Sequence, residues 1–141
     1  MIRKTYNELP EPNINKILVF GSNTQGKHGK GSALLAKEKW GAKYRQARGL
    51  QGNSYAIVTK DLTQNIHPSI PVISILWEID KLYTFAELSP ELEFYVAYKG
   101  NSSNLNGYTS LQMAKMFGVF TNIPENIIFE ENFAELVFNS I

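Results

Sequence analysis

Residues 19–33, VFGSNTQGKHGKGSA, place four glycines and two lysines between an apolar run and a helix-like run. Glycines let the backbone approach a ligand closely, and the first N–H groups of a helix that follows such a loop favour phosphate. The spacing of Gly26, Gly29 and Gly31 fits neither the P-loop nor the dinucleotide fingerprint. The stretch predicts a phosphate or pyrophosphate cradle, with a plain strand-to-helix turn as the alternative.

Other side chains near strand ends could also do chemistry. His28 is a candidate general base or phosphate donor, or a residue that only fills its turn. The Lys60–Asp61 pair suits phosphate binding or acid–base chemistry, or it forms a surface ion pair. The Asn23 amide can bind a ribose hydroxyl or a carbonyl, or it starts an Asx-turn. His67 is expected on the surface, and two distant histidines argue against a metal site.

Composition sets the broad class of protein. The 141 residues suggest one domain, and 43% hydrophobic residues are enough for a core. The absence of cysteine excludes a disulfide scaffold, a cysteine nucleophile and a cysteine-ligated zinc site. A net charge of +1 argues against a nucleic-acid partner or an acidic membrane. The polar N-terminal residues lack a secretory signal, so we expect a cytoplasmic protein that has no membrane span.

Apolar runs and helical spacing alternate along the chain. We expect strands at 16–20, 54–59, 92–99 and 126–129, and helices at 31–40, 72–87, 109–117 and 131–138. This alternation predicts an α/β fold with a mostly parallel sheet. In such folds ligands bind beyond the carboxyl ends of the strands. The loops that follow the first three strands are therefore expected to form one binding rim, in which Tyr108 either stacks on a ring or anchors its loop.

The motifs VFGSN, HGxG and GLQGxSYAIxTKD together resemble a family of small phage-associated and bacterial macrodomain-like proteins. The resemblance is strong over residues 16–61 and weaker beyond them. It implies a single domain over residues 1–141, built as a three-layer α/β/α sandwich with a mostly parallel mixed sheet. It also implies binding of ADP-ribose or a related nucleotide. We expect no cofactor and no metal.

The resemblance also assigns parts of the rim. It places the strand-end asparagine at a ribose, the HGxG glycines at the pyrophosphate, and the late glycine loop around the phosphates. Together with the rim, it gives a predicted ligand-binding set of Gly21, Ser22, Asn23, Gly26, Gly29, Gly31, Ser32, Gln51, Gly52, Thr59, Gly100, Asn101, Gly107 and Tyr108.

A hydrolytic branch of the family, the terminal-ADP-ribose glycohydrolases, suggests a second hypothesis. There a strand-end lysine, matched here by Lys60, attacks the sugar, and an aspartate in the late loop assists. Residues 100–108, GNSSNLNGY, contain no acid, so Asp61 and His28 are the remaining candidates to assist Lys60. The sequence therefore leaves three hypotheses: a binder of ADP-ribose or of an ADP-ribosylated macromolecule, a hydrolase, and a ligand-free partner-binding derivative.

Overall fold

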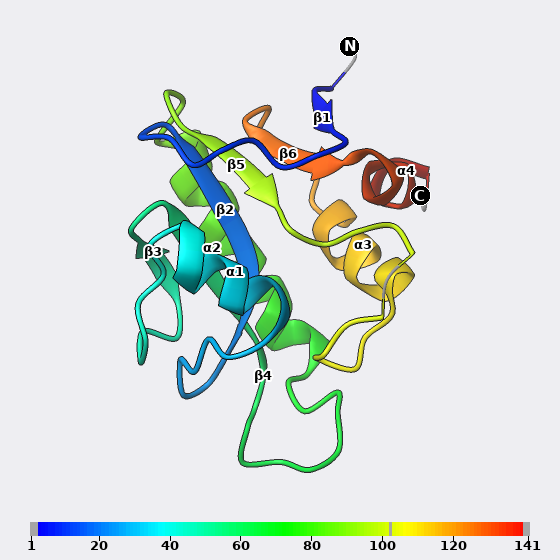
Figure 1. The fold of residues 1–141 in the computed structure, drawn as a ribbon. Helices are drawn as coiled ribbons and strands as arrows, with labels where there is room; N and C mark the ends of the chain where they lie inside the picture. The colour runs from blue at the N-terminus through cyan, green and yellow to red at the C-terminus, as the bar shows by residue number, and fades with distance from the viewer. Residues whose placement is uncertain (1–2, 102, 140–141) are drawn as a thin grey trace.

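A computed structural model describes residues 3–101 and 103–139 as an α/β fold with one sheet and four helices (Figure 1). The strands are β1 (Thr5–Tyr6), β2 (Lys16–Asn23), β3 (Gly49–Gln51), β4 (Ser54–Lys60), β5 (Glu93–Val96) and β6 (Ile127–Glu130). The helices are α1 (Gly31–Lys39), α2 (Val72–Glu87), α3 (Ser110–Gly118) and α4 (Glu131–Asn139).

The six strands lie in the order β1-β6-β5-β2-β4-β3. Every pair of neighbouring strands in this order is parallel except β4 and β3, which are antiparallel. The predicted mostly parallel sheet is therefore confirmed. β2 lies between β5 and β4, so its C-terminal end is the centre of the edge at which the parallel strands finish.

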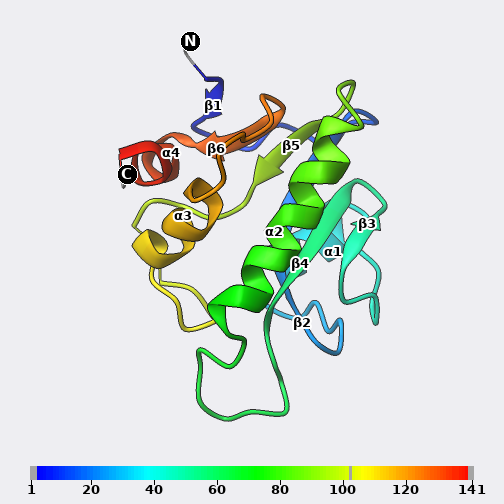
Figure 2. The ribbon, with the colours of Figure 1, turned by 180° about the vertical axis from the view of Figure 1, so that it is seen from behind.

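Helices cover both faces of β2, which explains its continuous apolar sequence. Ile17 and Val19 pack in the core cluster that contains the apolar residues of α2, α3 and α4. Leu18 and Phe20 point the other way and pack with the apolar residues of α1. Figure 1 shows α1 in front of β2, and Figure 2, seen from behind, shows α2 across the opposite face.

The connections from the two central strands run in opposite directions. From β2 the chain passes through α1 towards β4, whereas from β5 it passes through α3, on the other face, to β6. Such a switch leaves a crevice between the C-terminal ends of the two strands, because the loops that leave them diverge. The topology therefore places a binding site at the end of β2 and β5.

All four predicted helices are confirmed, and α2 has the predicted bounds. α3 begins after Thr109, which is its N-cap. The Thr109 Oγ1 accepts from the Gln112 N–H at 3.1 Å, and the Gln112 side chain accepts from the Thr109 N–H at 2.8 Å. This reciprocal capping box satisfies two N–H groups at the start of the helix.

Two strand ends were wrong by three residues, and β1 and β3 were not among the predicted strands. β2 continues through Gly21, Ser22 and Asn23, because these residues remain paired with β4. β5 ends at Val96, not at Lys99, because its pairing with β2 and β6 ends there. β3 was missed because it is a short edge strand in a mixed sequence. In the described part of the chain, no helix is long and apolar enough to cross a membrane.

Candidate functional site

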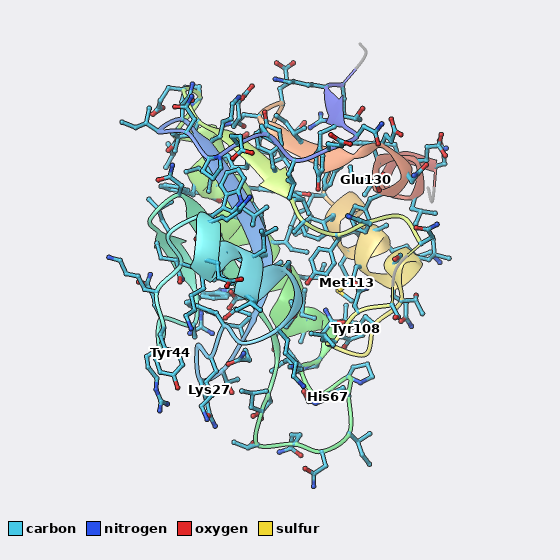
Figure 3. The ribbon with its side chains drawn as sticks, viewed as in Figure 1. Lys27, Tyr44, His67, Tyr108, Met113 and Glu130 are labelled. Carbon is cyan, nitrogen blue, oxygen red and sulfur yellow. The ribbon has the colours of Figure 1, made fainter. Side chains whose placement is uncertain are left out.

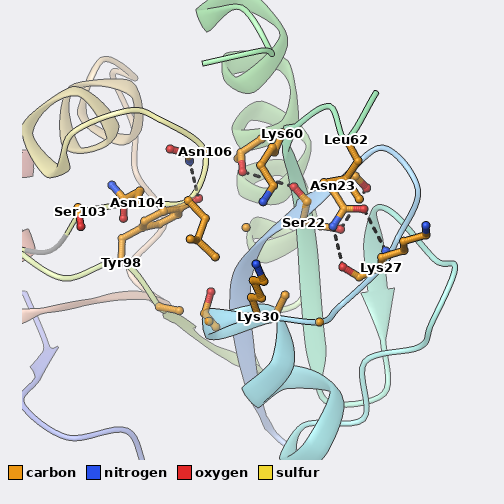
Figure 4. Close-up of a pocket in the computed structure, with 18 of the residues that line it drawn as sticks. Ser22, Asn23, Lys27, Lys30, Lys60, Leu62, Tyr98, Ser103, Asn104 and Asn106 are labelled. Atoms are coloured by element: carbon orange, nitrogen blue, oxygen red, sulfur yellow. Dashed lines mark hydrogen bonds between the residues drawn. The ribbon is translucent and has the colours of Figure 1, made fainter. Parts of the chain in front are cut away.

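A cavity of about 410 Å³ opens at the C-terminal ends of β2, β4 and β5 (Figure 4). This volume lies within the range of small-molecule pockets, about 300–1,000 Å³. Eight of the predicted site residues line it: Gly21, Ser22, Asn23, Gly29, Gly31, Ser32, Thr59 and Lys60. The remaining described lining residues are Lys27, Lys30, Ala33, Leu62, Ala97, Tyr98, Lys99, Ser103, Asn104, Leu105 and Asn106.

The start of α1 forms one side of the cavity. Lys30 is the N-cap residue and makes no side-chain capping bond, and Gly31 has a φ of +58°. The Leu34 N–H donates to the Lys30 carbonyl at 3.2 Å, so the N–H groups of Gly31, Ser32 and Ala33 precede the helical hydrogen-bond pattern. All three residues line the cavity, so the positive end of the helix dipole faces it.

Two other glycines of the cavity wall differ in how closely other atoms approach their backbone. A Cβ at Gly21 would lie 2.5 Å from the Tyr98 Oη, so only glycine lets this ring reach the strand. A Cβ at Gly29 would meet nothing within 4 Å. Gly29 therefore borders open space, and a larger side chain there can enter the cavity without a clash.

Asn23 organises the glycine-rich loop from the end of β2. Its side-chain Oδ1 accepts from the N–H groups of Gln25 at 3.2 Å and Lys27 at 3.0 Å. Its Nδ2 donates to the Lys27 carbonyl at 2.7 Å. These bonds match the Asx-turn that was the alternative to ribose binding. Although Asn23 lines the cavity, its amide holds the loop in shape.

Lysine supplies the charge of the cavity. Lys27, Lys30, Lys60 and Lys99 line it, and none of the described lining residues is an aspartate or a glutamate. Figure 4 shows the Lys30 and Lys60 side chains pointing towards one another across the cavity, whereas that of Lys27 points away. None of the four forms a salt bridge with a described residue. The cavity therefore favours an anionic ligand.

Tyr98 forms part of the floor. Its ring stacks on Phe133, with centroids 5.9 Å apart, and its hydroxyl accepts from the Asn106 Nδ2 at 3.4 Å. Burial raises the pKa of Tyr98 to about 12, so the hydroxyl remains neutral at physiological pH. The floor thus offers a neutral polar group beside the lysines.

The β5–α3 loop forms the opposite wall and is held by side-chain amides. The Asn104 Nδ2 donates to the Tyr108 carbonyl at 2.9 Å, and the Asn106 Oδ1 accepts from the Tyr108 N–H at 2.9 Å. The Gly107 N–H donates to the Asn104 carbonyl at 3.0 Å. Asn106 is 4% exposed, so this network is mostly closed to water.

The same loop docks on the connection between β4 and α2. The Tyr108 hydroxyl donates to the Ile70 carbonyl at 2.6 Å. Gly107 packs against the backbone of His67 and Pro68 so closely that a Cβ would lie 2.5 Å from the His67 carbonyl carbon. Figure 3 shows His67 and Tyr108 on these adjoining loops. Tyr108 and Gly107 therefore anchor the wall from behind and do not line the cavity.

The predicted catalytic residue His28 lies outside the cavity lining. It is 1% exposed, and its ring meets Phe20 edge to face at 5.1 Å between centroids. The Nε2 lies 3.1 Å from both the Gln46 carbonyl and the Gln51 Oε1. Gln51, a predicted ligand-binding residue, also accepts from the Lys43 N–H at 2.8 Å. Both side chains therefore hold the loops beneath the cavity together.

Asp61 also lies outside the lining and is engaged in a turn. Its Oδ1 accepts from the Thr63 hydroxyl at 2.7 Å, the Thr63 N–H at 2.9 Å and the Thr24 hydroxyl at 3.3 Å. The hydrogen bonds from Thr63 lower the pKa of the Asp61 carboxyl. Asp61 is thus not brought together with Lys60 in the cavity.

The remaining predicted positions make backbone contacts elsewhere. Gly26 packs on the backbone of Arg45, and Gly52 packs on Gly41. Gly100 packs on Asn132, and its N–H donates to the Glu130 Oε1 at 3.0 Å. Asn101 is exposed and does not line the cavity. Within the described ranges, no group of three or more His, Asp or Glu residues could hold a metal ion.

Sequence reasoning missed Lys30, Lys99, Tyr98 and the 103–106 part of the late loop as site residues. Tyr98 and Lys99 were assigned to the strand, and no local signal could have found them, because the end of β5 at Val96 is set by its pairing with β2 and β6. No protein-family model, curated protein or solved structure matches the chain significantly.

Proposed function

We propose that the protein binds ADP-ribose, or a related nucleotide with a pyrophosphate, in the cavity at the ends of β2, β4 and β5. The observation that carries this proposal is the lining itself, in which four lysines and no described carboxylate surround the start of α1. A pyrophosphate is the anion that combines this charge with an elongated shape. The free N–H groups of the first turn of α1 suit its oxygens.

We further propose that the fold is a three-layer, macrodomain-like sandwich. Two observations support this proposal: α1 packs on one face of the sheet, and α2, α3 and α4 pack on the other. The location of the cavity at the switch point between β2 and β5 agrees with ligand binding in open α/β sheets.

A second candidate function is hydrolysis of an ADP-ribosyl bond with Lys60 as the attacking amine. The position of Lys60 supports it, because this side chain points into the cavity (Figure 4). Asp61 and His28 do not line the cavity with it, so any acid that assists Lys60 comes from the ligand or from the macromolecule that carries it. Binding therefore has the stronger support of the two.

The third hypothesis, a derivative that has lost its ligand, requires a closed cavity. Tyr108 does not line the cavity, and Leu105 lines it, with its Cδ1 3.4 Å from a Cβ built at Gly31, but the cavity keeps a volume of about 410 Å³. The open space above Gly29 therefore favours a binder over a closed derivative.

Calorimetric titration with ADP-ribose tests the proposal. We expect saturable one-to-one binding, which Gly29→Val abolishes without changing the free energy of unfolding, because the new side chain enters open space. Lys30→Gln should weaken binding about tenfold, as expected for one lost charge-assisted contact. Lys115→Gln, an exposed lysine on α3, is the matched control.

The outcome that would contradict binding is no heat at millimolar ADP-ribose, or equal affinities for the wild type and Gly29→Val. The second candidate function is tested separately. Lys60→Gln should leave binding of ADP-ribose measurable and abolish release of ADP-ribose from a modified protein. Full turnover by this variant would exclude Lys60 as the attacking group.

A further inference from the structure

Two aromatic side chains are exposed on the described surface, Tyr44 at 53% and Trp77 at 51%. The other aromatic residues of the chain are buried or partly buried. Tyr44 lies in the loop between α1 and β3, and Trp77 lies on α2. Two arginines of that loop, three residues apart, contact the two rings: Arg45 lies over Tyr44 and Arg48 over Trp77.

Each of these rings is paired with two cations. The Lys37 Nζ lies 5.8 Å and the Arg45 guanidinium carbon 5.1 Å from the centroid of the Tyr44 ring. These positions are within range of a cation–π interaction.

Trp77 has the same arrangement, with the Arg48 guanidinium carbon at 5.9 Å and the Lys81 Nζ at 5.3 Å. We call these six residues, Lys37, Tyr44, Arg45, Arg48, Trp77 and Lys81, the basic–aromatic edge.

The net charge of +1 conceals a strong asymmetry along the chain. Residues 27–48 contain seven lysines and arginines and a single glutamate, a net charge of +6. The rest of the chain contains seven lysines and arginines and twelve carboxylates, a net charge of −5. The argument from net charge against a nucleic-acid partner therefore does not apply to this part of the surface.

The basic–aromatic edge continues into the wall of the cavity. The Arg45 N–H donates to the Gly26 carbonyl at 2.8 Å, which places the loop of Tyr44 against the glycine-rich loop. Figure 3 shows Tyr44 and Lys27 projecting from this same part of the molecule. Positive charge thus extends from Lys27 and Lys30 at the cavity to Arg45, whereas Arg48 at the β3 edge is paired with Glu78, whose Oε2 lies 3.0 Å from its Nε.

We propose that the basic–aromatic edge binds single-stranded nucleic acid. Two exposed rings and four cations lie along this edge, and the two groups are joined by the short segment from Arg45 to Arg48. Bases stack on aromatic side chains without sequence preference, and a positive surface follows the backbone. A duplex keeps its bases covered, so the rings favour a single strand. The proposal is independent of ADP-ribose binding because none of the six residues lines the cavity.

Fluorescence anisotropy with a labelled oligothymidylate of about 12 nucleotides tests the proposal, since sites of this kind span about 4–16 nucleotides. At about 0.1 M salt we expect a dissociation constant in the micromolar range that rises steeply with salt. The duplex of the same length should bind about tenfold more weakly. No binding of the single strand, or tighter binding of the duplex, would overturn the proposal.

Variants separate stacking from charge. Tyr44→Ala and Trp77→Ala should each weaken binding about tenfold, whereas Tyr44→Phe, which keeps the ring, should bind as the wild type does. The double variant Lys37→Gln, Arg45→Gln should weaken binding and reduce the slope of log affinity against log salt. Lys115→Gln should match the wild type. Retained affinity in both alanine variants would overturn the assignment of the rings.

Two further measurements test other partners. Vesicles of phosphatidylserine and phosphatidylcholine should not retain the protein at the same salt concentration. Retention by vesicles without oligonucleotide binding would replace the proposed partner with an anionic membrane. Saturating ADP-ribose should leave the oligonucleotide affinity unchanged. Displacement by ADP-ribose would place the strand in the cavity and overturn the assignment to the β3 edge, whereas failure of ADP-ribose to bind affects only the proposed function.

Discussion

The β2–α1 wall of the cavity, residues 21–33, presents mainly glycines and the backbone N–H groups of a helix start. The described lining of the β5–α3 wall, residues 97–99 and 103–106, presents amide and aromatic side chains together with Lys99. The first wall is organised locally, because Asn23 holds the loop only four residues away. The second is held from a distance, because Tyr108 bonds to Ile70. The comparison suggests that anion binding belongs to the first wall, and that the second sets the shape of the cavity.

The largest expected effect tests the docking of the β5–α3 wall. Gly107 has a φ of +88° and contacts the His67–Pro68 backbone, so Gly107→Ala adds both backbone strain and overlap. We expect it to lower the free energy of unfolding by about 3 kcal/mol, measured by urea denaturation.

Gly49 provides the matched control for this substitution. It has a φ of +85°, but a Cβ there would meet nothing within 4 Å. Gly49→Ala should therefore cost only the strain, about 1 kcal/mol. Equal losses in the two variants would mean that the contact with His67 and Pro68 does not hold the wall.

A smaller effect is expected at the hydroxyl that ties the two loops together. Tyr108→Phe removes the hydrogen bond to the Ile70 carbonyl and keeps the ring, so we expect a loss of about 1 kcal/mol in the free energy of unfolding. Hydrogen exchange of the Gly107 amide should become faster. Tyr44→Phe, at an exposed hydroxyl, should change neither quantity. An unchanged exchange rate in Tyr108→Phe would mean that this hydrogen bond does not stabilise the wall.

The sequence predicted the first wall much better than the second. The apolar run at Lys16–Phe20, the glycines that follow it and the start of α1 are all local signals, and the structure places Gly21, Gly29, Gly31 and Ser32 around the cavity. All four helices were likewise predicted, because their apolar residues recur at helical spacing or follow a clear cap.

The second wall was not predictable in detail because it depends on contacts between distant residues. Where β5 ends is set by its pairing with β2 and β6, and this end decides that Tyr98 faces the cavity. The roles of Gly107 and Tyr108 depend on the position of the 61–71 loop, which no local pattern reveals. The position of His28 outside the lining also depends on a distant contact, since Gln51, its partner, lies 23 residues away.

The smallest expected effect concerns charge, which is compensated differently at the two ends of the sheet. At the cavity the lysines face no described carboxylate, whereas Lys16, at the start of β2, and Lys4 each lie 2.7 Å from Glu93. Hydrogen bonds from Lys16 and Lys4 lower the pKa of the Glu93 carboxyl from 4.5 to about 2. A pKa that is lower in the folded state stabilises the protein above the unfolded pKa, and this stabilisation is lost as pH falls from about 5 to 2.

Glu93→Gln removes this contribution to the free energy of unfolding. The pH-dependent contributions of the other carboxyl groups are the same in both proteins, so they cancel when the variant is compared with the wild type. Because the Glu93 side chain is 28% exposed and Lys4 is more exposed still, we expect the difference to be below about 1 kcal/mol at pH 7 and to shrink towards zero near pH 2. Urea denaturation at several pH values measures it. Added salt should reduce the difference at pH 7, because both pairs are accessible to ions. A difference that stays constant between pH 7 and pH 2 would show that Glu93 contributes to stability through packing and not through its charge. The ion pairs at the start of β2 would then not distinguish this end of the sheet in stability from the cavity end, where the lysines face no described carboxylate.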